Sequence, residues 1–181
     1  RKRTVSVDQV IHPTVAIKNS SIRDHYNELS LEYAGHYTVV FRAYDDAVAY
    51  RFKTALGDSI SVTGERFNVT LPQDASAWFA YAGRWMNSYE HLYFKHPVAS
   101  LSKDQTAQLP LLIDLNHEGK VLITESDLID YPGLYFTGDH GNTLTSIFPP
   151  AVKTERKNTP GQGGWDRNFI PETRYDYLAR T

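Results

Sequence analysis

The stretch Tyr37-Thr-Val-Val-Phe-Arg-Ala-Tyr-Asp-Asp-Ala-Val-Ala-Tyr-Arg-Phe52 indicates the fold class of this chain. Two runs rich in β-branched and aromatic residues flank the segment Asp45-Asp46-Ala47. β-Branched and aromatic residues favour strands, and Asp favours turns because its side chain hydrogen-bonds the local backbone. The stretch therefore predicts a β-hairpin.

A second hairpin is predicted further along the chain. The apolar run from Leu111 to Leu115 is separated from the run 121–124 by the polar segment Asn116-His-Glu-Gly119. Gly119 can adopt the positive φ that closes such a loop.

Alternation of apolar and polar residues extends this pattern beyond the hairpins. It occurs at Val5 and Val7, then at Leu29, Leu31 and Tyr33, and again at Ile60 and Val62. Period-two alternation indicates one buried and one solvated face, as in antiparallel sheets. Turn signals recur about every ten residues without alternating long helices. We therefore expect an all-β fold, a mostly antiparallel β-sandwich with few short helices.

We expect one sandwich domain over residues 1–181, with an exposed Pro- and Gly-rich loop at 149–164 and a terminal strand near 173–179. Helical spacing is confined to the stretches 85–92 and 125–130, each about two turns long. The chain opens Arg1-Lys2-Arg3 without an initiator Met or a signal segment, so we expect a processed protein or part of a longer one.

Composition excludes several classes of function. The chain of 181 residues is 41% hydrophobic with a formal net charge of −2, which excludes a mainly disordered chain and gives no general attraction to nucleic acid. No apolar run approaches the ~18–20 residues of a membrane helix. The sequence contains no cysteine, so disulfides, thiol nucleophiles and thiolate metal sites are excluded.

Familiar catalytic motifs are also missing from the sequence. It contains no G-x-S-x-G, no phosphate-binding G-x-x-x-x-G-K-[ST], no H-E-x-x-H and no strand-linked G-x-G-x-x-G. The seven histidines are scattered, and only His91 and His96 lie close together. None of these familiar patterns therefore indicates a catalytic site.

Three carboxylates follow an apolar strand at Glu125, Asp127 and Asp130. One interpretation is a helix start with Thr124 as N-cap, because the helix dipole favours acids in the first turn. The other is a site for a hard cation such as calcium, which takes six to eight oxygen ligands. Six residues cannot supply such a shell, so further ligands would have to come from elsewhere.

Aromatic residues gather between positions 78 and 93: Trp78, Tyr81, Trp85, Tyr89 and Tyr93. Their rings can pack in the core or stack on the apolar faces of sugars. The second alternative corresponds to a stand-alone carbohydrate-binding or adhesion module.

Five segments resemble the N-terminal domain of family 97 glycoside hydrolases, a group of α-glucosidases and α-galactosidases from Bacteroides-like bacteria. They occur in the family's order, and they are Asp24-His-Tyr-Asn-Glu-Leu29, Phe41 to Phe52, Asn87-Ser-Tyr-Glu90, Leu109-Pro-Leu-Leu112 and Ile123-Thr-Glu-Ser-Asp-Leu-Ile-Asp-Tyr-Pro-Gly133. The resemblance implies a β-sandwich of the super-sandwich type, followed in the intact enzyme by a catalytic (β/α)₈ barrel and a C-terminal β domain. This chain would be part of the first domain, truncated at both ends.

The resemblance also implies roles for individual residues. Glu125 matches the carboxylate that this domain lends to a calcium ion beside the substrate, whose other ligands lie on the barrel. Tyr89, Glu90 and Tyr131 lie in two of the matching segments and are candidates for substrate contact. The substrate would be an oligosaccharide with α-linked glucose or galactose, and the location periplasmic or outer-membrane associated. The catalytic acid and base belong to the barrel, so this chain alone is expected to be inactive and to bind calcium weakly or not at all.

One position departs from the family pattern. The family usually has Gly where this chain has Ala47. If that position required positive φ, Ala would cost about 1 kcal/mol relative to Gly; otherwise the turn has another geometry.

Overall fold

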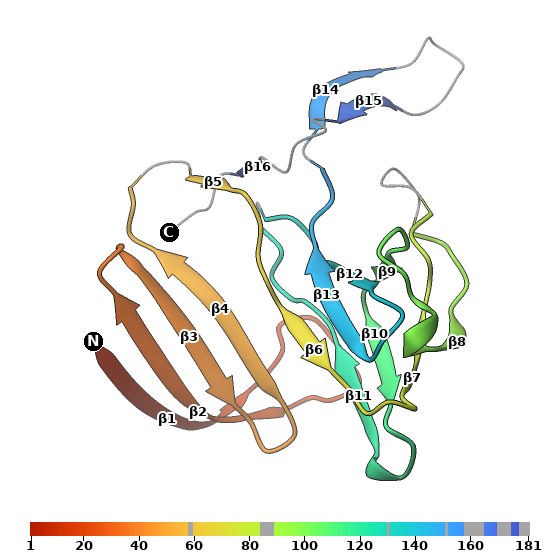
Figure 1. The fold of residues 1–181 in the computed structure, drawn as a ribbon. Coiled ribbons are helices and arrows are strands. Elements are labelled where there is room, and N and C mark those ends of the chain that lie inside the picture. The colour runs from red at the N-terminus through yellow and green to blue at the C-terminus, as the bar shows by residue number, and fades with distance from the viewer. Residues whose placement is uncertain are drawn as a thin grey trace. The chain divides into compact units, whose positions relative to one another are not determined.

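The computed structural model describes residues 1–57, 60–83, 89–129 and 131–150, and the strands at 152–157, 165–169 and 175–177. In these parts of the chain strands dominate, accompanied by two short 3₁₀ helices, and the strand pairings are antiparallel (Figure 1). The all-β prediction is confirmed. The chain divides into two compact units that meet in sequence at residues 58 and 59. We call them unit 1 and unit 2.

Unit 1 is built on a four-stranded sheet whose neighbours are consecutive in sequence. Figure 1 shows its strands side by side in the order β1-β2-β3-β4. Their bounds are β1 (Lys2–Ile11), β2 (Ile22–Tyr33), β3 (Tyr37–Ala43) and β4 (Val48–Thr54). Because each strand pairs with the next one along the chain, this sheet forms without any residue of unit 2.

The first predicted hairpin is confirmed in β3 and β4. Val39 lies opposite Phe52, and the turn is closed by a hydrogen bond from the Tyr44 amide to the Ala47 carbonyl at 2.8 Å. Outside glycine, the described residues with positive φ are His36, Tyr89, Asn116, Asp127 and His140, so Ala47 is not among them. The turn therefore has a geometry that does not need Gly at position 47.

Unit 2 contains two four-stranded sheets and two strand pairs, in the orders β11-β10-β7-β8, β6-β13-β12-β9, β14-β15 and β16-β5. The bounds are β5 (Ile60–Val62), β6 (Asn68–Thr70), β7 (Ser76–Phe79), β8 (Phe94–Pro97), η1 (Val98–Ser100), β9 (Ala107–Gln108), β10 (Leu111–Asp114), η2 (Asn116–Glu118), β11 (Lys120–Ile123), β12 (Tyr135–Gly138), β13 (Thr143–Ile147), β14 (Val152–Lys157), β15 (Trp165–Phe169) and β16 (Tyr175–Tyr177).

The core of unit 2 lies between its two four-stranded sheets. Phe79, Leu111 and Ile113 come from the first sheet, and they share one buried cluster with Phe136 and Leu144 from the second. Burial of such side chains stabilises a fold by about 1.5–3 kcal/mol each. Two sheets that enclose a common apolar layer form a β-sandwich, as the sequence predicts.

The second predicted hairpin is also confirmed. Leu111 lies opposite Ile123 in β10 and β11, and η2 forms the connection. Gly119 has a φ of 113°, and its carbonyl accepts a hydrogen bond from the Leu115 amide at 2.9 Å. The glycine therefore supplies the positive φ expected at this point.

The expected helices and loop need correction. Residues 125–129 form no helix, and the positive φ of 56° at Asp127 breaks the helical path. In the stretch 85–92, residues 84–88 lie outside the described part and 89–92 are not helical. The expected loop at 149–164 contains β14, which pairs with β15, while β16 lies within the expected terminal strand. Residues Val152 to Lys157 form a strand because they pair with β15, a partner that the local composition did not indicate.

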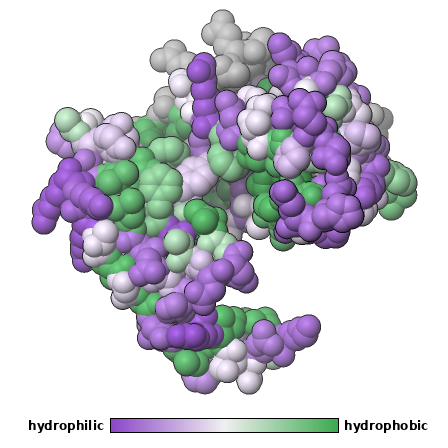
Figure 2. All heavy atoms as spheres, turned by 60° about the horizontal axis from the view of Figure 1, so that its bottom comes forward, coloured by the Kyte–Doolittle hydropathy of each residue, from purple (hydrophilic) through white to green (hydrophobic). Residues whose placement is uncertain are grey.

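Apolar side chains also reach the surface among hydrophilic ones (Figure 2). Large examples that are more than half exposed include Val48, Leu92 and Leu122. Some exposed apolar residues are neighbours, because Phe41, Val48 and Phe52 lie on the adjacent strands β3 and β4 of unit 1. Among the residues that the structure describes, no helix is both long and apolar enough to cross a bilayer.

Candidate functional site

Glu125 lies just after β11, in the segment 124–134 that connects β11 to β12; we call this segment the Glu125 loop. Its carboxylate oxygen Oε2 accepts a hydrogen bond from the Leu134 amide at 2.9 Å. This bond joins the beginning of the loop to its end. The loop reverses direction at Asp127, where the Ile129 amide donates to the Asp127 carbonyl at 2.8 Å. Asp tolerates the left-handed backbone required there better than most residues do.

The environment of Glu125 disfavours its charged form. Partial burial raises the pKa of this carboxyl, the Leu134 amide opposes that rise, and the nearby charge of Glu65 adds to it. A half-buried carboxylate next to another acid gains stability when a cation approaches. Both features are therefore appropriate for a metal ligand.

Glu125 lines an open cavity of about 390 Å³. The other walls include Tyr89, Leu109, Pro110, Leu128 and Leu134. One carboxylate in a largely apolar hollow is an arrangement typical of ligand sites, in which a few polar groups fix orientation. The peptide bond between Leu109 and Pro110 is cis.

Tyr131 occupies the same loop, but its side chain is held by the protein. Its hydroxyl donates to Glu65 Oε2 at 2.8 Å, and its ring packs edge-on against Phe148 with centroids 5.7 Å apart. Burial, together with this hydrogen bond, raises the pKa of Tyr131 above its ordinary value. Sequence reasoning missed Glu65, because it lies 66 residues before Tyr131 and no local pattern links the two.

The remaining candidates for substrate contact separate into two cases. Tyr89 is 55% exposed with a φ of 59°, lines the same cavity as Glu125, and shares a hydroxyl–hydroxyl hydrogen bond with Tyr135. Left-handed backbone at a non-glycine residue is uncommon and tends to occur at functional sites. Glu90 is exposed and does not line the cavity. The structure therefore brings Tyr89 and Glu125 together but leaves Glu90 outside.

The donor set can be compared with what calcium requires. Carboxylate oxygen is the ligand type that calcium prefers, but six to eight oxygens are needed. Within the described ranges, no group of three or more His, Asp or Glu side chains is arranged to hold a metal ion. Glu125 is a suitable type of ligand, but a calcium ion bound there would need its other ligands from outside the described residues.

The aromatic residues between 78 and 93 do not form one common platform in the described part of the chain. Trp78 lies under two ammonium groups, with Lys95 Nζ at 4.7 Å and Lys120 Nζ at 5.6 Å from the ring centroid. The ring of Tyr81 packs against Phe79 and His96, with centroids 5.1 Å away in both cases. Tyr89 and Tyr93 are exposed, and Trp85 lies outside the described residues.

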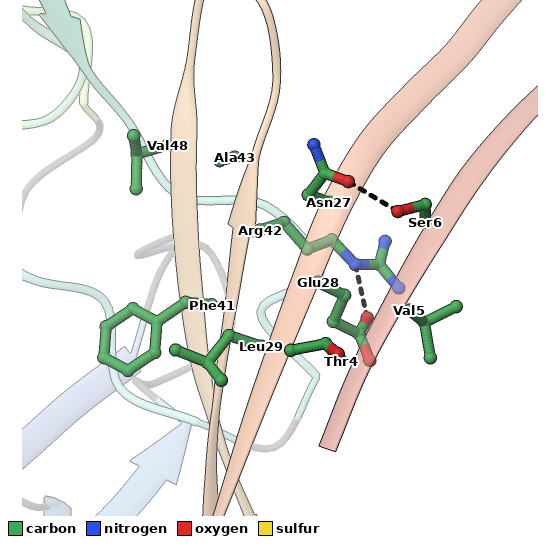
Figure 3. A pocket seen from close by; sticks show the side chains of 10 residues that line it. All are labelled: Thr4, Val5, Ser6, Asn27, Glu28, Leu29, Phe41, Arg42, Ala43 and Val48. Atoms are coloured by element: carbon green, nitrogen blue, oxygen red, sulfur yellow. Dashed lines mark hydrogen bonds and ion pairs between the residues drawn. The ribbon is translucent and has the colours of Figure 1, made fainter. Parts of the chain in front are cut away.

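A second cavity, of about 380 Å³, lies in unit 1 along the sheet (Figure 3). Its polar features are an ion pair between Arg42 Nε and Glu28 Oε2 at 2.9 Å and a hydrogen bond from Ser6 to Asn27 at 2.6 Å. Figure 3 shows both joining neighbouring strands. These side chains satisfy one another, so they are explained by the stability of the sheet.

Known proteins resemble this chain in sequence and in fold. Residues 1–165 match the family described as Glycosyl-hydrolase 97 N-terminal. The chain is 34% identical over 186 residues to a retaining alpha-galactosidase of Bacteroides thetaiotaomicron, covering 97% of this chain and 27% of that protein.

Solved structures of family 97 glycoside hydrolases from Pseudoalteromonas sp. have the same fold. A complex with acarbose superposes with a TM-score of 0.68 at 22% identity, covering 83% of this chain and 24% of the other. A variant in complex with panose gives 0.67 at 23% identity with the same coverage. This chain thus spans about a quarter of the length of these relatives. The match over nearly the whole chain, together with the curated relative, shows that the chain belongs to the N-terminal domain family of family 97 glycoside hydrolases.

Proposed function

We propose that this chain is the N-terminal domain of an enzyme that hydrolyses α-galactosidic or α-glucosidic bonds in oligosaccharides, and that it provides part of the substrate pocket. Family membership and the relative named retaining alpha-galactosidase support this proposal. The proposal includes a catalytic barrel and a C-terminal domain in the same polypeptide, and export to the periplasm or outer membrane.

The position of Glu125 is the observation that carries the proposal. Leu134 fixes Oε2, whereas Oε1 has no hydrogen-bond partner among the described residues, and the side chain lines the 390 Å³ cavity. A carboxylate with one oxygen fixed and the other open is suited to share a calcium ion with a second domain.

The chemistry follows from this shared site. Calcium, when bound, supplies a fixed positive charge that polarises the glycosidic oxygen or supports the acid and base. In this chain, Leu134 orients Glu125, and apolar side chains such as Leu109 and Leu128 line the cavity beside the carboxylate. Glycoside hydrolysis also needs two catalytic carboxyl groups, which the proposal places on the barrel. The chain alone is then inactive.

The test is hydrolysis of a chromogenic α-galactoside and a chromogenic α-glucoside by the full-length protein, with calcium and with chelator. We expect chelator to abolish turnover, and Glu125→Gln to require at least about tenfold more calcium for half-maximal activity, since it removes a charged ligand. Glu118→Gln is the matched control, because Glu118 is exposed in η2. Equal calcium dependence in both variants would refute the role of Glu125.

The same experiment tests the alternative of a stand-alone carbohydrate-binding module. That alternative requires a full-length protein without turnover on either sugar, together with saturable glycan binding by residues 1–181 alone. The covered Trp78 and the packed Tyr81 do not favour it.

A further inference from the structure

We propose that the hydrogen bond between Tyr131 and Glu65 is a positioning device that holds the Glu125 loop in the geometry required for calcium. This inference rests on the proposed function of Glu125 and extends it to two residues that do not themselves contact the ion or the sugar.

Glu65 is held firmly to the core of unit 2. Its backbone carbonyl accepts a hydrogen bond from Ser146 Oγ at 2.7 Å, and that same hydroxyl oxygen accepts the Phe67 amide at 2.8 Å. The Ser146 amide also donates to the Phe67 carbonyl at 3.0 Å. Ser146 belongs to β13 and is buried. The segment around Glu65 is therefore fixed to a central strand of the second sheet.

The Glu125 loop has few attachments of its own. Residues 126–129 are exposed, and the backbone contacts described within the loop are the turn at Asp127 and the Leu134–Glu125 bond. Tyr131 is the point at which the loop is tied to another element through a side chain, by its hydroxyl to Glu65 and by its ring to Phe148. Leu134 is buried beside Phe148 in the same small apolar cluster.

These contacts link Glu125 to the core through a short path. Tyr131 fixes the last third of the loop, and three residues later the Leu134 amide holds Glu125 Oε2. Loss of the Tyr131 hydroxyl would remove a hydrogen bond between the loop and Glu65, while the contacts of the apolar cluster remain. Because a metal ligand must be held within about 0.5 Å of its working position, such loosening reduces affinity for the ion.

The experiment measures the calcium dissociation constant of the full-length protein by titration calorimetry. Tyr131→Phe keeps the ring on Phe148 but removes the hydroxyl, and we expect it to weaken calcium binding about 5- to 30-fold. Glu65→Ala should weaken it similarly, and Glu65→Gln, which keeps an acceptor, should lose less. The double variant Tyr131→Phe/Glu65→Ala should be no weaker than the weaker single variant, because both changes break one bond. Tyr81→Phe is the matched control and should bind calcium like the parent.

Two further measurements separate positioning from other roles. Faster hydrogen exchange at the Leu134 amide in Tyr131→Phe would show directly that the loop has loosened. Saturating calcium should restore kcat/KM of Tyr131→Phe to near the parental value, which it would not do if Tyr131 contacted substrate. A calcium dissociation constant within twofold of the parent, or fully additive losses in the double variant, would overturn the inference.

Failure of the inference can be told apart from failure of the proposed function. If Glu125→Gln weakens calcium binding and Tyr131→Phe does not, the positioning role alone is wrong. If Glu125→Gln itself leaves the dissociation constant unchanged, Glu125 is not a ligand and both proposals fall.

Discussion

Gly138 in β12 passes so close to Leu101 that no other residue fits at its position. A Cβ built on Gly138 would meet the carbonyl carbon and the Cβ of Leu101 at 3.0 Å, and the carbonyl oxygen at a still shorter distance. That oxygen is fixed by the His140 amide at 3.1 Å, and Leu101 is fully buried. The backbone of Leu101 therefore cannot move away to make space for a side chain at position 138.

Gly138→Ala should consequently destabilise the protein. We expect a loss of about 2–4 kcal/mol in the free energy of unfolding, as for other overpacked core positions. Urea unfolding followed by far-UV circular dichroism measures it. Gly64→Ala is the control, because nothing lies within 4 Å of its Cβ position. Equal stability of the two variants would contradict the close approach.

Asp114 should make the folding stability of the protein depend on pH. Its carboxylate pairs with Lys95 Nζ at 2.9 Å and Lys120 Nζ at 3.3 Å, and the Lys95 hydrogen bond holds the pKa of Asp114 below its ordinary value of 3.8. Because the pKa of Asp114 is lower in the folded state, its carboxylate stabilises the fold at pH values above the ordinary pKa. This contribution is lost as the pH falls below that pKa and through the lowered one.

Asp114→Asn should therefore lower the urea midpoint at pH 7, and the difference from the parent should shrink at about pH 3. Asp8→Asn provides the comparison, because Asp8 and its partner Arg23 are both more than half exposed and should matter little. A constant difference across this pH range would show that Asp114 acts through its shape and not its charge.

Glu125→Gln should stabilise the calcium-free protein, even though it impairs the proposed function. The amide oxygen can still accept the Leu134 hydrogen bond, while the charge disfavoured by burial and by Glu65 is removed. We expect the melting temperature to rise by about 1–3 °C, a size common for relief of strain at a functional site. Calorimetry in chelator measures it; a lower melting temperature would show that the carboxylate is favourable without metal.

Ala47→Gly tests the hairpin turn of unit 1. Because Ala47 does not adopt positive φ, Gly should add only unfolded-state entropy and cost about 0.5–1 kcal/mol. The measurement is the urea unfolding free energy of the full chain. A gain in stability would mean that position 47 favours the left-handed backbone that Gly adopts readily.

Local sequence was sufficient for the two predicted hairpins and for the all-β class. The residues around Ala47 and around Gly119 predict both the strands and the turn within about fifteen residues. Neighbouring side chains and backbone preferences therefore determine the structure of these hairpins. The same reasoning identified Glu125, Asp127 and Asp130 as a candidate cation site but left open a helix start, and only the family resemblance singled out Glu125.

The contacts that the sequence could not provide are those between distant segments. The left-handed residue Asp127 and the Leu134 amide replace a helix with a closed loop, and Glu65 approaches Tyr131 from 66 residues away. Strand β14 likewise depends on its partner β15. No periodicity within either partner specifies such pairings, because they arise from the packing of the whole unit.

The two units also differ in when they can fold. All pairings of the unit 1 sheet join consecutive strands, whereas β6 pairs with β13 through Val69 and Leu144, and β5 pairs with β16. A growing chain can therefore assemble the first sheet soon after Thr54 leaves the ribosome, but it must wait for residues beyond 147 before the sandwich closes. In that interval Phe79, Leu111 and Ile113 lack their covering sheet, so we expect chaperone binding during synthesis to concentrate on the first half of unit 2.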